Sequence, residues 1–158
     1  MSRLLTLDQS SQTSGWAYFE DNKLVKYGKF TFDYPDIGVR LTQIRKKVKE
    51  LIETYLPDEV VFEDIQLQEN TKTFKILAEV YGVIYELVSE LGIKNDAVLA
   101  SSWKSTLGIK GRARAEQKRN AQQYIINNYG IKPTQDECDA ICIGLHHILS
   151  ANPNDWSK

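Results

Sequence analysis

The chain has 158 residues, of which 42% are hydrophobic and 26% are charged, and its formal net charge is -1. A chain of this length is typically one domain that buries about 70% of its unfolded surface, so a disulfide scaffold is not required. Its apolar runs are far shorter than the roughly 20 residues that span a bilayer. Because residues 1–3 lead directly into a strand-like segment and not into a signal-peptide core, we expect a cytoplasmic protein with a single domain over 1–158.

The first 32 residues predict three antiparallel strands. Residues 3–8 are short and apolar and end on a carboxylate, Asp8, after which small polar residues and a glycine indicate a turn. Segments 16–20 and 24–32 are rich in aromatic and β-branched residues, and the polar tripeptide 21–23 between them is typical of a hairpin.

Helices and strands alternate in the rest of the chain. Apolar residues recur at three and four over 41–55, which predicts an amphipathic helix that ends before Pro57. The run 60–62, followed by Glu63, has the character of a central parallel strand that is buried on both faces. We also expect a helix at 71–91, a strand at 97–100, and helices at 114–129 and 135–149. This order predicts an α/β fold with a mixed five-stranded sheet, three antiparallel strands and then two parallel ones, flanked by helices.

Four carboxylates stand at positions that are typical of a catalytic or metal-binding site. Asp8 and Glu63 each follow an apolar strand, and parallel neighbouring strands would place both at the carboxyl edge of the sheet, where α/β proteins bind ligands. Asp136 and Asp139 are three residues apart near the start of the last helix, which the capping box at 134–137 fixes. Alone, each has a simpler role in a turn or at a helix dipole. Together they predict a site for hard divalent cations, which bind carboxylate oxygens and activate water.

Three segments resemble, in order, the motifs of RuvC-like Holliday-junction resolvases, which have a ribonuclease H-like fold. They are residues 5–17 (LTLDQSSQTSGWA), 60–64 (VVFED) and 136–145 (DECDAICIGL). Residues 103–118 are similar to the basic stretch that precedes the final helices of that family. The likeness runs from about residue 3 to 149. The compact size and the divergent connecting segments resemble the bacteriophage branch of the family more than the cellular one.

The resemblance implies a metal-dependent endonuclease of DNA recombination and repair. Such an enzyme binds branched DNA as a homodimer, with no nucleotide cofactor and no membrane, and cuts phosphodiesters to leave 5′-phosphate ends. If a phage encodes the chain, we expect the protein in the cytoplasm of the bacterial host. The resemblance assigns two Mg²⁺ ions, or alternatively Mn²⁺, to four ligands that would also be catalytic: Asp8, Glu63, Asp136 and Asp139.

The chain departs from the cellular pattern at two places. It has Gln9-Ser10-Ser11 where cellular relatives have a glycine shortly after the first aspartate. Polar Gln66 stands where those relatives carry an aromatic residue that is associated with engaging bases at the junction centre. We therefore expect broader cleavage of branched DNA, including forks and flaps as well as Holliday junctions.

The segment 103–119 is strongly basic. Six basic residues against Glu116 alone give it a charge of +5, so the remaining chain carries -6. Such a patch favours a DNA backbone, because neutralising phosphates and releasing counterions supplies much of the affinity. Lys104 or Lys118 would also stabilise the pentacoordinate phosphate, and Lys118 is our candidate catalytic lysine. A solvated basic face is the simpler alternative. The predicted DNA-binding residues are Lys104, Lys110, Arg112, Arg114, Lys118 and Arg119.

The helix at 71–91 carries two apolar stripes, so its apolar surface is wider than packing on one sheet requires. Gly82 would allow a second helix to approach closely, and two symmetry-related sites would suit paired incisions across a junction. The alternative is an ordinary core helix that the other helices cover. The predicted dimer interface consists of Phe74, Tyr81, Gly82 and Tyr85.

Two other functions match parts of the sequence. Residues 8–15 also resemble the phosphate-binding hairpin of actin-like and sugar-kinase ATPases, but those proteins need two such domains and this length allows one. In a non-catalytic module that binds branched DNA, the acidic residues would only tune metal or DNA affinity. The presence of all four carboxylates favours the endonuclease over this module.

Overall fold

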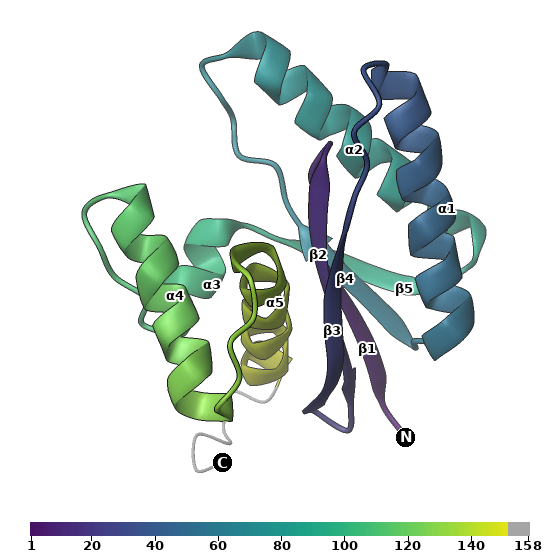
Figure 1. The fold of residues 1–158 in the computed structure, drawn as a ribbon. Coiled ribbons are helices and arrows are strands. Elements are labelled where there is room, and N and C mark those ends of the chain that lie inside the picture. Colours follow the sequence, from purple (N-terminus) through teal and green to yellow (C-terminus); the bar gives the residue numbers. More distant parts are fainter. Residues whose placement is uncertain (152–158) are drawn as a thin grey trace.

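The computed structural model describes residues 1–151, which form a five-stranded sheet in the order β3-β2-β1-β4-β5 (Figure 1). β1 pairs with β2, and β2 with β3, in antiparallel fashion, whereas the β1–β4 and β4–β5 pairs are parallel. The predicted mixed sheet is therefore confirmed. The predicted domain extends to residue 158, and positions 152–158 lie outside the described residues. The strands are β1 (Arg3–Asp8), β2 (Thr13–Glu20), β3 (Lys23–Thr31), β4 (Glu59–Glu63) and β5 (Lys94–Val98).

Helices cover both faces of the sheet (Figure 1). Leu5 and Leu7 of β1 belong to the core that the sheet forms with α1 and α2. Leu4 belongs to the core on the opposite face, which the sheet forms with α3, α4 and α5. Burial on both faces explains why the central strands have continuous apolar runs. None of the helices within residues 1–151 is long and apolar enough to cross a membrane. The helices are α1 (Ile37–Tyr55), α2 (Thr71–Glu90), α3 (Ala100–Thr106), α4 (Arg114–Tyr129) and α5 (Gln135–Ala151).

Three details differ from the sequence predictions. β5 spans Lys94–Val98 and not 97–100, because an edge strand tolerates polar residues that hide its pattern. Ala100 instead opens α3, a helix of seven residues that is too short to show a clear apolar period. Gly15 does not lie in a turn but inside β2, which begins at Thr13.

The start of α5 is fixed by the predicted capping box. The backbone N–H of Thr134 donates to Glu137 Oε1 at 2.9 Å, and the backbone N–H of Glu137 donates to Thr134 Oγ1 at 3.4 Å. These reciprocal bonds satisfy backbone donors that the first turn leaves without helical partners. They hold the turn that carries Asp136 and Asp139.

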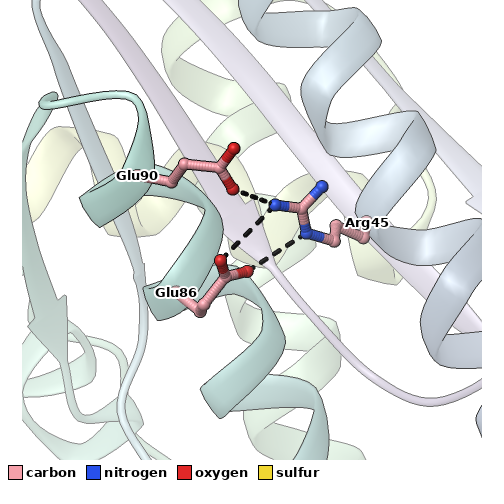
Figure 2. A network of polar contacts seen from close by, with 3 residues as sticks. All are labelled: Arg45, Glu86 and Glu90. Atoms are coloured by element: carbon pink, nitrogen blue, oxygen red, sulfur yellow. Dashed lines mark hydrogen bonds and ion pairs between the residues drawn. The ribbon is translucent and has the colours of Figure 1, made fainter.

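Ion pairs join α1 to α2 on the other side of the sheet (Figure 2). The Nε atom of Arg45 donates to Glu86 Oε2 at 3.1 Å, and its guanidinium also pairs with Glu90. Both glutamate side chains are more than half exposed, so the pairs contribute little to the free energy of unfolding. The apolar residues between the two helices, such as Val48 and Ile84, provide most of their attachment.

Leu56, at the C-terminal end of α1, has a left-handed backbone with φ 50° and ψ 56°, and its side chain is exposed. Glycine adopts this conformation without strain, so we expect Leu56→Gly to raise the free energy of unfolding by about 0.5–1 kcal/mol. Urea denaturation would measure the change. Gly130 closes α4 in the same conformation with open space around it, so Gly130→Ala should lower stability. A lower midpoint for Leu56→Gly would contradict the expectation.

Candidate active site

Asp8 and Glu63 lie side by side at the carboxyl edge of the sheet. The parallel ladder between β1 and β4 ends with the pair Leu7 and Phe62, so the next residue of each strand is one of these two carboxylates. The two carboxyl groups are close enough to share a hydrogen bond. Two acids that are 55 residues apart in the sequence thus meet at the edge where α/β proteins bind ligands.

Two contacts bring α5 to this edge. The buried hydroxyl of Thr6 donates to the carbonyl oxygen of Ala140 at 2.7 Å, which ties the helix to β1. Gly15, the antiparallel partner of Asp8, contacts the first turn of α5 so closely that a Cβ there would lie 1.9 Å from the carbonyl oxygen of Asp136. Only glycine permits this approach, and the approach places the acidic turn of α5 over the end of β1.

The four predicted carboxylates line a single cavity of about 650 Å³. The structure therefore brings together residues from β1, β4 and α5 that are far apart in the sequence. Basic residues of α3 and α4 line the same cavity, so it contains both negative and positive groups. The charged residues of this lining are Asp8, Glu63, Asp64, Asp136, Asp139, Lys104, Arg114 and Lys118.

Burial raises the pKa values of three of these acids. The pKa of Asp8 is well above its ordinary value because the group is desolvated and lies close to Glu63, Asp139 and Asp136. Burial also raises the pKa of Glu63, although its hydrogen bond with Asp8 and the nearby charges of Lys104 and Arg114 oppose the rise.

Burial raises the pKa of Asp139 to about 7, and the nearby charge of Glu63 contributes to the rise. Lys104 and Lys118 pull in the opposite direction. A cluster of buried carboxylates carries repulsion that a cation would relieve, which is typical of functional sites.

The donor chemistry of this site fits hard divalent cations. Carboxylate oxygens are the ligands that Mg²⁺ and Mn²⁺ prefer, and the cavity supplies them from several directions. No group of three or more His, Cys, Asp or Glu side chains within residues 1–151 forms a ready-made metal site. The fit therefore rests on the identity and burial of the carboxylates, and their role as ligands stays a prediction.

The predicted DNA-binding residues separate into two groups. Lys104, Arg114 and Lys118 line the cavity, and Lys104 Nζ donates to Gln117 Oε1 at 3.0 Å while lying 5.5 Å from the centre of the Trp103 ring. The second group lies outside the cavity lining on exposed positions of the loop before α4 and of α4 itself: Lys110, Arg112 and Arg119.

The predicted dimer residues lie along α2. Gly82 is exposed and has open space where a side chain would project, and Tyr85 is 51% exposed. The rings of Tyr81 and Tyr85 stack at 6.2 Å, and Tyr81 also contacts Phe62 edge-on at 5.1 Å. Phe74 is half-buried, so the set combines anchored aromatic rings with an accessible helix surface.

Sequence reasoning missed several residues of the site. Gln9 and Trp103 line the cavity, and Gln117 lines it while bonding to Lys104. The indole N–H of Trp103 is buried without a hydrogen-bond partner among the described residues. The glutamines carry no local signal, because their partners lie in other parts of the chain.

A mixed sheet in the order β3-β2-β1-β4-β5 with helices on both faces defines a ribonuclease H-like fold, and this fold gathers acidic residues of β1, β4 and α5 around one cavity. Residues 4–147 match the family model of the crossover junction endodeoxyribonuclease RuvC. The chain belongs to the RuvC family.

Relatives and solved structures agree with this assignment. The chain is 27% identical to the crossover junction endodeoxyribonuclease RuvC of Caldanaerobacter subterraneus, with 95% of this chain and 94% of that protein covered. It is 26% identical to that of Syntrophomonas wolfei, with coverages of 94% and 89%.

Two solved structures share the fold. One is Thermus thermophilus RuvC in complex with a Holliday junction substrate, with a TM-score of 0.77, 16% identity and coverages of 98% and 97%. The other is the Fowlpox virus resolvase with substrate Holliday junction DNA, with a TM-score of 0.59, 18% identity and coverages of 94% and 98%.

Proposed function

We propose that this protein is a metal-dependent endonuclease that cleaves phosphodiesters in Holliday junctions and in other branched DNA. The observation that carries the proposal is the single cavity that three basic side chains line together with the four predicted carboxylates, which come from three elements. Membership of a family described as crossover junction endodeoxyribonucleases supports the reaction class. Related folds solved with Holliday junction DNA support the substrate class, and action on DNA fits the cytoplasm.

In this proposal the four carboxylates hold two Mg²⁺ or Mn²⁺ ions: Asp8, Glu63, Asp136 and Asp139. Bound divalent cations supply an activated water and stabilise the leaving oxygen of the phosphodiester. Lys104 and Lys118, whose charges reach Asp139, stabilise negative charge that develops on the phosphate. Lys104 also acts on Glu63, so both lysines, and not Lys118 alone, are candidates for this role.

The loop between β4 and α2 supports broad selectivity for branched DNA. It lines the cavity with polar Gln66 and Gln68 and with Ile65, whereas Leu67 is 83% exposed and does not line it. Hydrogen-bonding side chains at this position tolerate several base arrangements, because they do not require one stacked geometry. Forks and flaps should therefore be cut together with four-way junctions.

A gel assay with end-labelled DNA tests the function directly. A Holliday junction, a fork, a flap and a linear duplex would each be incubated with the protein in Mg²⁺, in Mn²⁺ and in EDTA. We expect cuts with 5′-phosphate ends in the branched substrates only, and none in EDTA. Retarded but uncut junctions in both metals would identify a non-catalytic binding module, and ATP-dependent thermal stabilisation without DNA cleavage would support the ATPase alternative.

We also propose that two copies of the chain pair through α2. The exposed glycine and tyrosines described above offer a surface for close helix packing, and a two-fold axis would give two sites for paired incisions. Gly82→Arg should place a charged side chain in that contact. Light scattering should then show a mass that falls from twice 18.1 kDa to 18.1 kDa.

The matched control for this variant is Glu53→Arg, an exposed change on α1 that should leave the dimer intact. A wild-type protein that elutes as a monomer at micromolar concentration would contradict the pairing. A Gly82→Arg variant that keeps the dimer mass would show that the interface does not lie on α2.

A further inference from the structure

The side chain of Gln9 takes the place of a backbone hydrogen-bond pair between two strands, at the edge of the sheet that carries the carboxylates. The backbone pairing of β1 with β4 stops at Leu7 and Phe62, one residue before Asp8 and Glu63. Beyond that point, the Nε2 atom of Gln9 donates to the carbonyl oxygen of Glu63 at 2.5 Å, and the backbone N–H of Glu63 donates to Gln9 Oε1 at 3.0 Å. The side-chain amide thus bonds both backbone groups of Glu63, as a neighbouring peptide unit would.

This pairing acts at the point where the carboxylates of two adjacent strands lie side by side. Asp8 and Glu63 are half-buried carboxylates that follow the last paired residues of adjacent strands, and in their ionised forms they repel one another. Without a link to the backbone beyond Leu7, the ends of β1 and β4 could separate to relieve this repulsion. A bond to backbone atoms resists separation without using either carboxylate, so the acids stay free for ligands.

We infer that Gln9 is a positioning residue that holds the backbone of Glu63 beside Asp8 and so pre-organises these two carboxylates for divalent cations. The inference rests on the proposed function, because it assigns Gln9 a task in the same metal site. Only a side chain with both a donor and an acceptor at this length makes the pair of bonds. Asparagine is one methylene shorter, and methionine has the length without the donor.

The nearby polar residues do not duplicate this contact. Ser10 and Ser14 bond to one another and to the backbone of their own turn, through Ser10 Oγ to the carbonyl oxygen of Thr13 at 2.7 Å and Ser14 Oγ to that of Ser10 at 3.2 Å. They shape the connection between β1 and β2. Gln9 alone among these residues reaches β4 within the part of the chain that the structure describes.

The test is Mn²⁺ binding to the DNA-free protein, followed by electron paramagnetic resonance, for the wild type, Gln9→Met and Gln9→Asn. Both variants should bind Mn²⁺ about 10- to 100-fold more weakly, as is typical when a group that orients a metal ligand is removed. Junction cleavage should need correspondingly more Mg²⁺, whereas the KM for DNA at saturating metal should not change. The control is Gln12→Ala, an exposed glutamine of the same loop with no side-chain hydrogen bond among the described residues.

The outcomes separate the inference from the proposed function. If the wild type neither binds Mn²⁺ nor cuts, the proposed function fails. If the wild type binds Mn²⁺ and a folded Gln9 variant binds it equally well, the inference alone is overturned. Loss of the folded state in both variants, seen by circular dichroism, would also overturn it, because Gln9 would then support the whole fold and not the site.

Discussion

Asp8→Asn should reduce junction cleavage at least about 1,000-fold while leaving junction binding largely intact, because metal activation of the reacting groups is worth several kcal/mol. Asp8 lies close to Glu63, Asp139 and Asp136, so a neutral amide there removes charge from the carboxylate cluster. Single-turnover cleavage and a gel-shift assay in Ca²⁺ would measure the two effects separately.

The matched control is Asp33→Asn, which makes the same chemical change at an exposed position outside the cavity lining. This variant should cut at the wild-type rate. Undiminished cutting by Asp8→Asn would refute the assignment of the site, and equal loss of binding and cleavage would show that the acid supports the fold.

Gly15→Ala should lower cleavage by at least about 100-fold, because a shift of about 1 Å in a catalytic group has an effect of this size. The added Cβ would lie 1.9 Å from the carbonyl oxygen of Asp136 and 2.9 Å from the backbone nitrogen of Glu137. Neither atom can rotate away, so the first turn of α5 must move and must carry Asp136 with it. We expect the free energy of unfolding to fall by about 1–3 kcal/mol as well.

A second glycine separates the two effects. A Cβ on Gly144 would lie 2.2 Å from the ring of Phe19, in the core that α5 forms with β2 and away from the cavity lining. Gly144→Ala should therefore lose stability by a similar amount but keep its cleavage rate per folded molecule. Thermal melts would be compared with single-turnover rates well below both midpoints. Equal losses of activity in the two variants would mean that Gly15 affects only stability.

The sequence predicted the sheet and the acidic cluster because both have local signals. Asp8 and Glu63 each end an apolar strand, and a capping box marks the turn that holds Asp136. The parallel pairing of β1 with β4 then brings these signals together, as the strand order requires. The sheet and the proximity of the acids could be predicted because the signals for them lie within single strands or at the start of a single helix.

The other features depend on contacts between distant segments. Gly15 is typical of a turn when its neighbours are small and polar, and only the packing of α5 shows why no side chain fits there. Gln9 is one polar residue among several until the early end of the β1–β4 ladder reveals its partner. The predicted position of β5 was too far along the chain because its first three residues are polar. An edge strand tolerates polar residues, so a search for apolar runs does not detect its start.

The link between Thr6 and Ala140 joins residues 134 positions apart, and the last described helix supplies two of the four acids. Contacts of such sequence separation form late, because the loop they close must first lose its freedom. During synthesis, a chain that has emerged only as far as α4 holds half of the acidic cluster. In the proposed site, the capacity to cut DNA therefore arises only when folding is nearly finished, so incomplete chains that lack α5 should not cut DNA.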